Sequence, residues 1–145
     1  MRTMGKTLGV MAAIVLIAAC DPAPPKEVAV HTDPAPVAET FPEVGEIVQA
    51  SWVEERMGAS EGRVAAPGPS DFRLSAVVKL RPEAVAKVLD GYKCQAGSPA
   101  VPEPLKGLFP SGVKWLSCEL PMNGKARTAF VADGSEQAFL SSTTM

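Results

Sequence analysis

The chain has 145 residues, with 14 basic and 16 acidic side chains and a formal net charge of −2. This balance provides no basic stripe that could neutralise phosphates, so the composition argues against nucleic acid as a partner. The single histidine, His31, lies outside the part of the chain predicted to fold. We therefore expect no metal site and no histidine-based catalytic site in the folded part.

The first twenty residues have the organisation of an export signal. Residues 1–7 carry Arg2 and Lys6 and no acid, and residues 8–19 form an apolar run. A helix of that length rises about 18 Å, which is too short for a permanent span of a hydrocarbon core of about 30 Å. The run therefore predicts a signal peptide over residues 1–19 rather than a transmembrane anchor.

The apolar run ends in Ile17-Ala18-Ala19-Cys20. This sequence resembles the lipobox of bacterial lipoproteins, in which an aliphatic residue and two small residues precede a cysteine. The resemblance implies cleavage between Ala19 and Cys20 and attachment of diacylglycerol to the Cys20 sulfur. Several acyl chains suffice for lasting membrane attachment. An ordinary secretory signal, in which Cys20 has no special role, is the alternative.

Acylation of Cys20 would set both the location and the charge of the mature protein. The resemblance implies a lipid anchor in the inner or outer membrane of a bacterial cell envelope, with the domain facing the periplasm or the cell exterior. Removal of residues 1–19 leaves 12 basic and 16 acidic side chains, a net charge of −4. Anionic lipids would not attract such a chain, so the acyl chains would hold it alone. No cofactor other than this covalent lipid is expected.

Residues 20–43 are predicted to be the lipidated cysteine and a proline-rich tether. Residues 22–42 contain six prolines and few apolar side chains, a composition typical of extended polyproline-II chain with a rise of about 3.1 Å per residue. We expect a reach of up to about 70 Å, with His31 solvated and the folded domain spanning residues 44–145. A recognition role for the repeated Pro-Ala-Pro is the alternative.

The first half of the domain is predicted to hold two strands and one helix. Residues 44–57 have apolar spacing that suits a helix but content that suits a strand, and we predict a strand. Residues 58–70 are rich in glycine and proline and predict a loop. Residues 71–80 alternate between apolar and polar, which predicts a strand with one buried face. A short helix is then expected from Pro82 to a C-terminal glycine, Gly91.

Cys94 and Cys118 form an even pair once Cys20 is set aside. In an oxidising compartment such a pair predicts a disulfide. Closing that loop of about 25 residues would contribute about 3.5 kcal/mol in the chain-entropy model. The residues between them begin with a long loop, 95–112, whose expected inward anchors are Leu105, Leu108 and Phe109.

The C-terminal third predicts an antiparallel meander. Asn123-Gly124 and Asp133-Gly134 separate alternating segments and favour type I′ hairpin turns. The strands are expected at residues 113–120, 125–132 and 136–142. The fold class is therefore α+β, with an antiparallel sheet of four to five strands and one short helix packed on one face.

Trp115 is predicted to lie on the sheet face opposite Cys118. An exposed tryptophan on a sheet is a common contact for a protein partner, and we expect Trp115 to be such a contact. Alternatively, Trp115 covers a second small core beneath the 95–112 loop.

The domain sequence contains no recognisable catalytic set. Ser111 and Lys114 match the S-x-x-K pattern, but the family that uses it places the serine at a helix start, whereas here it opens a strand. We therefore expect a non-enzymatic module that binds an envelope protein or polymer. Two alternatives stay open. Residues 92–97 (YKCQAG) resemble the start of small periplasmic lysozyme-inhibitor lipoproteins, which implies a β-barrel that acts on lysozyme or the cell wall. The 105–109 segment could instead be the lid of a small lipophilic-ligand carrier.

Overall fold

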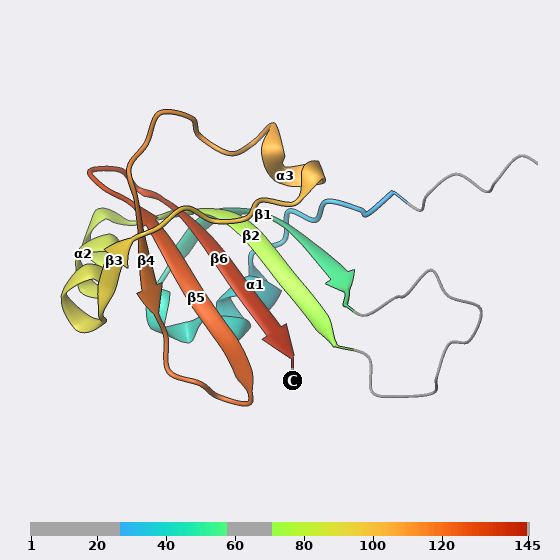
Figure 1. The fold of residues 1–145 in the computed structure, drawn as a ribbon, viewed down its shortest axis with the longest axis horizontal. Coiled ribbons are helices and arrows are strands. Elements are labelled where there is room, and N and C mark those ends of the chain that lie inside the picture. The colour runs from blue at the N-terminus through green and yellow to red at the C-terminus, as the bar shows by residue number, and fades with distance from the viewer. Residues whose placement is uncertain (1–26, 58–70, 145) are drawn as a thin grey trace, which may run out of the picture.

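The computed structural model describes residues 27–57 and 71–144, which form one antiparallel sheet with short helices (Figure 1). The strand order is β1-β2-β6-β5-β4-β3. The strands are β1 (Ile47–Arg56), β2 (Phe72–Leu80), β3 (Cys94–Ala96), β4 (Trp115–Glu119), β5 (Lys125–Ala132) and β6 (Gln137–Thr144). The helices are α1 (Ala35–Thr40), the 3₁₀ helix η1 (Pro42–Val44), α2 (Pro82–Gly91) and α3 (Glu103–Lys106). The predicted α+β class and antiparallel sheet are confirmed.

The sheet has six strands rather than four to five. The unpredicted strand is β3, which has three residues and lies at the start of the expected 95–112 loop. Three residues are too few to show a period of two, so only their pairing with β4 identifies them as a strand. The same segment contains the unpredicted helix α3.

Helix α2 connects the strand pair β1–β2 to the opposite edge of the sheet. Strands β1 and β2 pair at one side, and α2 then carries the chain to the opposite edge (Figure 1). Strand β3 follows α2 at that edge, and β4, β5 and β6 then return as the predicted meander, so that β6 pairs with β2. The sheet is open, with β1 and β3 as its edges, whereas the lysozyme-inhibitor resemblance implied a barrel.

Strand β2 and helix α2 follow directly from their sequence patterns. Strand β2 buries alternate residues against the helices: Leu74, Ala76, Val78 and Leu80. Helix α2 has proline in its first turn and buries Ala84, Val85 and Val88 on one face. The expected helix end is wrong in detail. Gly91 is the last residue of the helix and does not have a positive φ. The residue that caps the helix is Tyr92, which has an extended backbone.

The folded domain begins well before residue 44, so the predicted tether is wrong for residues 28–43. The side chains of Val37 in α1, Val44 in η1 and Phe41 between the two helices are buried in the helix-side core. Prolines did not prevent these helices, because they occupy first-turn positions where a missing N–H costs nothing. His31 is exposed, as expected, but its backbone pairs with Trp52 of β1.

The predicted signal peptide and lipidation site fall within residues 1–26, which lie outside the described residues. The loop predicted for residues 58–70 also lies outside them. In the described part of the chain no helix has the length and apolarity needed to cross a membrane.

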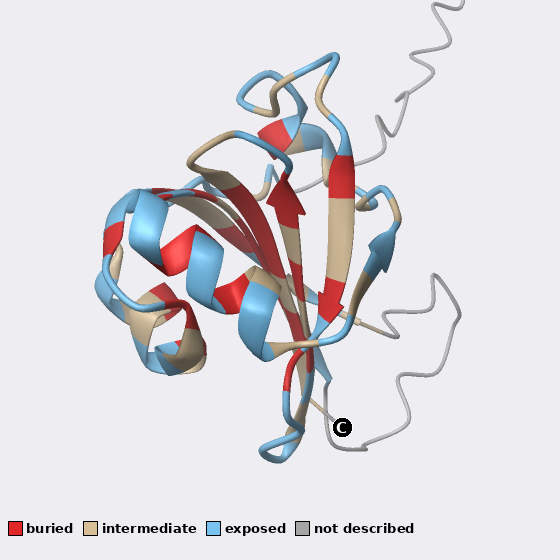
Figure 2. Cartoon of the chain, turned by 90° about the vertical axis from the view of Figure 1, so that its left-hand side faces the viewer, coloured by how far each residue is buried: buried red, intermediate tan, exposed pale blue. Residues whose placement is uncertain are grey.

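Side chains pack on both faces of the sheet. The helices α1, η1 and α2 cover one face (Figure 2), and the larger core lies between them and the sheet. On the second face, residues 97–114 lie over a smaller core of Val53, Leu105, Trp115, Ala132 and Phe139. Leu105 is fully buried, as expected, but Leu108 is 51% exposed.

Trp115 belongs to this second core and is only 6% exposed. Its ring stacks on Phe109 with a centroid distance of 4.7 Å. The prediction that Trp115 is an exposed partner contact is therefore wrong, because the 97–114 segment covers it.

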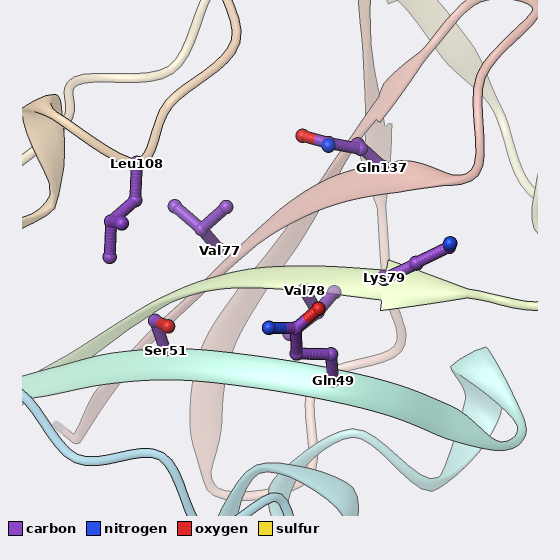
Figure 3. Close-up of a pocket in the computed structure, with 7 residues that line it drawn as sticks. All are labelled: Gln49, Ser51, Val77, Val78, Lys79, Leu108 and Gln137. Atoms are coloured by element: carbon purple, nitrogen blue, oxygen red, sulfur yellow. The ribbon is translucent and has the colours of Figure 1, made fainter.

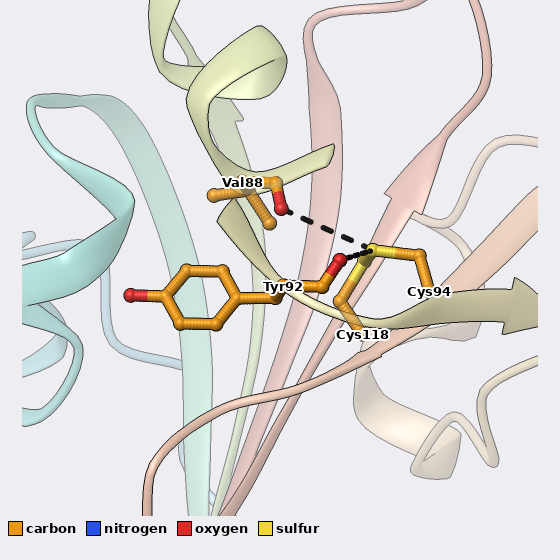
Figure 4. The surroundings of a disulfide bond; sticks show 4 residues. All are labelled: Val88, Tyr92, Cys94 and Cys118. Carbon is orange, nitrogen blue, oxygen red and sulfur yellow. Dashed lines mark hydrogen bonds between the residues drawn. A yellow bond between two sulfur atoms is a disulfide. The ribbon is translucent and has the colours of Figure 1, made fainter. Parts of the chain in front are cut away.

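The disulfide between Cys94 and Cys118 is confirmed. The two cysteines lie opposite each other in β3 and β4, and Cys118 is fully buried on the face covered by α2. The carbonyl oxygens of Val88 and Tyr92 lie 3.9 and 3.5 Å from the Cys94 sulfur (Figure 4). A bonded sulfur has no proton to donate, so these are packing contacts that bring the end of α2 against the bridge.

The two hairpin turns of the meander differ from the predicted type I′. Gly124 and Gly134 have positive φ, but no described non-glycine residue does, whereas type I′ needs two such positions. The strands also end early. The last β4–β5 pair is Glu119 with Thr128 and the last β5–β6 pair is Val131 with Ala138, so both connections exceed two residues.

Candidate functional site

A small hollow lies on the second face of the sheet, where β1, β2 and β6 meet the loop that follows α3 (Figure 3). Its volume is about 130 Å³. The lining residues are Gln49, Ser51, Val77, Val78, Lys79, Leu108 and Gln137. Carboxamide, hydroxyl and ammonium groups therefore share this surface with an exposed leucine.

The strand register places three of the polar side chains in one row. Gln49 of β1 pairs with Lys79 of β2, which pairs in turn with Gln137 of β6. Neighbouring strands are about 4.8 Å apart, so the two carboxamides flank the lysine. The Lys79 ammonium lies 3.4 Å from the carboxylate of Glu136. The row thus offers donors and acceptors close to an apolar patch.

The side-chain oxygen of Gln137 lacks a hydrogen-bond partner among the described residues. This atom, Oε1, is buried. Leaving such an acceptor unpaired costs about 1–3 kcal/mol. Because Oε1 is buried, a ligand N–H can reach it only after the Gln137 side chain rotates into the hollow, and the hydrogen bond to an amide would then recover that cost.

The size of the hollow limits what it can bind. Pockets that enclose a drug-sized molecule have volumes of about 300–1,000 Å³, and this hollow has about 130 Å³. It can take a side group of a longer chain, such as one amide, but not a whole lipophilic molecule. Leu105, expected to be part of a ligand lid, belongs instead to the second core.

The sequence-predicted site residues do not meet in this hollow. Ala19 and Cys20 lie outside the described residues. Ser111 and Lys114 are both exposed, and within residues 27–57 and 71–144 no hydrogen bond joins their side chains. The glutamines were missed because nothing local marks them. They become neighbours only through the pairing of β6 with β2, which brings together segments far apart in sequence.

A buried ion pair fixes the N-terminal helices to the sheet on the other face. The Arg127 guanidinium of β5 donates to the Glu43 carboxylate at 2.6 and 2.8 Å, and to the carbonyl oxygens of Thr40 and Pro121. The Arg127 side chain is only 3% exposed. The pair therefore connects η1, the end of α1 and the β4–β5 connection at one point.

A second, exposed pair joins the start of β1 to the start of α2. Arg81 donates to Glu46 at 2.7 and 3.1 Å. The hydrogen bonds, and then the charge of Arg81, hold the pKa of Glu46 below its ordinary value. This carboxylate is therefore ionised at neutral pH and supports the junction between η1 and the sheet.

No protein-family model, curated protein or solved structure matches the chain. Within the described residues, no three histidine, cysteine, aspartate or glutamate side chains are grouped so that they could hold a metal ion.

Proposed function

We propose that this chain is a small lipoprotein of the bacterial cell envelope. Acyl chains on Cys20 would hold it to a membrane, and its folded domain would bind an envelope protein or polymer without catalysing a reaction. The hollow beside Leu108 would hold an amide group of that partner. Amides occur both in polypeptides and in N-acetylated glycans, so either source provides the chemistry.

The observation that carries the proposal is the pairing of Cys94 with Cys118. The chain has three cysteines, so this bond leaves Cys20 without a partner in the domain. An odd cysteine in an exported chain needs another role. Its place after the apolar run and two alanines supports acylation as that role.

Because the fold begins near residue 28, the folded domain starts only a few residues after Cys20. The folded part includes Val28, which packs against the second core. Only residues 21–27 separate Cys20 from it. Seven residues span at most about 25 Å when fully extended. An acylated Cys20 would therefore keep the domain next to the membrane surface rather than about 70 Å away, and its partner would be a component within that distance.

Cross-linking in cells tests the anchoring and binding parts separately. The full chain and its Cys20→Ala variant are expressed, and the membrane fraction and cross-linked products are compared. Acylation predicts that the full chain carries added acyl mass and that the variant does not. If the full chain carries no more acyl mass than Cys20→Ala, the anchoring proposal is wrong.

Gln137→Leu tests the binding part on the anchored chain. It removes the unpaired acceptor and should lower the yield of cross-linked partner about fivefold or more, consistent with the loss of about 1 kcal/mol from one hydrogen bond. Gln95→Leu is the matched control, because Gln95 is an exposed glutamine of the edge strand β3. Digestion of the product by protease or by glycan hydrolase identifies the source of the amide. Equal yields for both variants would refute binding at this hollow.

A further inference from the structure

A second hollow lies on the helix side of the sheet, between α1 and the ends of β1, β2 and β6, and has a volume of about 190 Å³. It is distinct from the amide hollow, with which it shares no lining residue. It is lined by Pro36, Glu39, Thr40, Trp52, Glu54, Phe72, Leu74, Lys125, Ser142 and Thr144. Two aromatic rings, two carboxylates and one ammonium group therefore face a single space.

One of the two aromatic groups, Trp52, is held in a fixed position. The Trp52 indole N–H donates to the carbonyl oxygen of Asp33 at 2.8 Å, and its ring stacks on His31 with a centroid distance of 4.5 Å. Phe72 is 40% exposed although it starts a central strand of the sheet. Aromatic faces attract cations, tryptophan most strongly.

The carboxylates give the hollow an excess of negative charge. Glu39 comes from α1 and Glu54 from β1, both exposed, and neither forms a salt bridge with any described residue. Lys125 is the only cation among the lining residues. Two acids against one base leave a site that a second cation can neutralise.

Ser142 adds a hydrogen-bonding group to the lining of the hollow. It is only 4% exposed, it lines the hollow, and its hydroxyl has no hydrogen-bond partner among the described residues. The Thr144 hydroxyl beside it is hydrogen-bonded to the backbone of Phe72, so Ser142 provides the hydroxyl that a ligand in the hollow can contact. Its oxygen can accept a hydrogen bond from a cationic N–H.

We propose that this hollow binds a lysine or arginine side chain of a partner protein. The cation would lie against Trp52 and Phe72, with Glu39 and Glu54 neutralising its charge and the Ser142 hydroxyl accepting one of its N–H groups. The acidic balance of the chain, a formal net charge of −2, favours such a basic partner. The inference concerns the folded domain and depends neither on acylation of Cys20 nor on the amide hollow.

The test uses the full chain purified from cells in detergent micelles and a terminally blocked Gly-Arg-Gly peptide as the probe. The chain has two tryptophans, so a nitrogen–proton NMR spectrum shows two indole signals. The Trp52 signal should shift on titration. The Trp115 signal should not, because Trp115 is buried in the core of the other face. The same peptide with citrulline in place of arginine keeps the shape without the charge and should bind at least fivefold more weakly.

Substitutions of single charges give opposite expected signs. Glu54→Gln should weaken arginine-peptide binding about threefold and Lys125→Gln should strengthen it about threefold, as expected for one partly exposed charge. Glu55→Gln is the matched control. Glu55 directly follows Glu54 in β1 and lies opposite Arg73 of β2, so its side chain is on the other face of the sheet. It should leave binding unchanged. Equal effects of Glu54→Gln and Glu55→Gln, equal binding of the citrulline peptide, or equal shifts of both indoles would overturn the proposal.

Discussion

The strongest structural claim about the N-terminal region is that residues 35–44 belong to the fold, and Phe41 tests it. Phe41 is fully buried among the helix-side core residues. Truncating such a side chain costs about 3–5 kcal/mol, because transfer free energy is lost and a cavity remains. A domain of this size has a total stability of about 5–15 kcal/mol. Phe41→Ala should therefore remove a large part of it and lower the melting temperature by about 15 °C or more.

Urea unfolding followed by circular dichroism measures the effect on the full chain in detergent. Phe72→Ala is the matched control, since it removes the same atoms from a phenylalanine that is 40% exposed, and it should cost less than half as much. A Phe41→Ala cost below about 1 kcal/mol, in the range of surface substitutions, would refute the reasoning. Residues 28–43 would then be the tether that their composition suggested.

Three further predictions concern bonds that hold the domain together. Glu43→Gln leaves the buried Arg127 guanidinium without a counter-charge and should cost about 3 kcal/mol in urea unfolding; a cost below about 1 kcal/mol would contradict the pair's role. Reducing the disulfide should lower the free energy of unfolding by about 3.5 kcal/mol, and an unchanged midpoint would argue against this. The pKa of Glu46 is lowered by Arg81, so its stabilising contribution is present above the ordinary value of 4.5 and disappears as pH falls through the lowered value. Arg81→Met should therefore destabilise the chain more at pH 7 than at pH 3, and equal effects would disprove the link.

Local patterns predicted those parts of the fold in which one face is buried. The alternation in residues 71–80 predicted β2 correctly, because each second side chain enters the helix-side core. The apolar stripe after Pro82 predicted α2 for the same reason. The even cysteine pair predicted the bridge, and the structure adds that β3 and β4 align the two residues.

Composition failed where tertiary contacts override local preference. The prolines of residues 34–42 favour extended chain, yet Phe41 and the Arg127–Glu43 pair hold this segment against the sheet. Alternation placed Trp115 on the correct face but could not reveal that the 97–114 segment covers it. The two hollows depend on the pairing of β6 with β2. That contact is non-local, and no periodicity in the chain specifies it.

We propose that an acylated Cys20 is joined to a disulfide-bonded domain. The intact mass of the membrane-extracted protein, with alkylation before and after reduction, measures both features at once. We expect a chain that starts at Cys20 and carries added acyl mass, in which two cysteines are alkylated only after reduction. An unacylated chain, or Cys94 and Cys118 that are alkylated without reduction, would contradict this proposal.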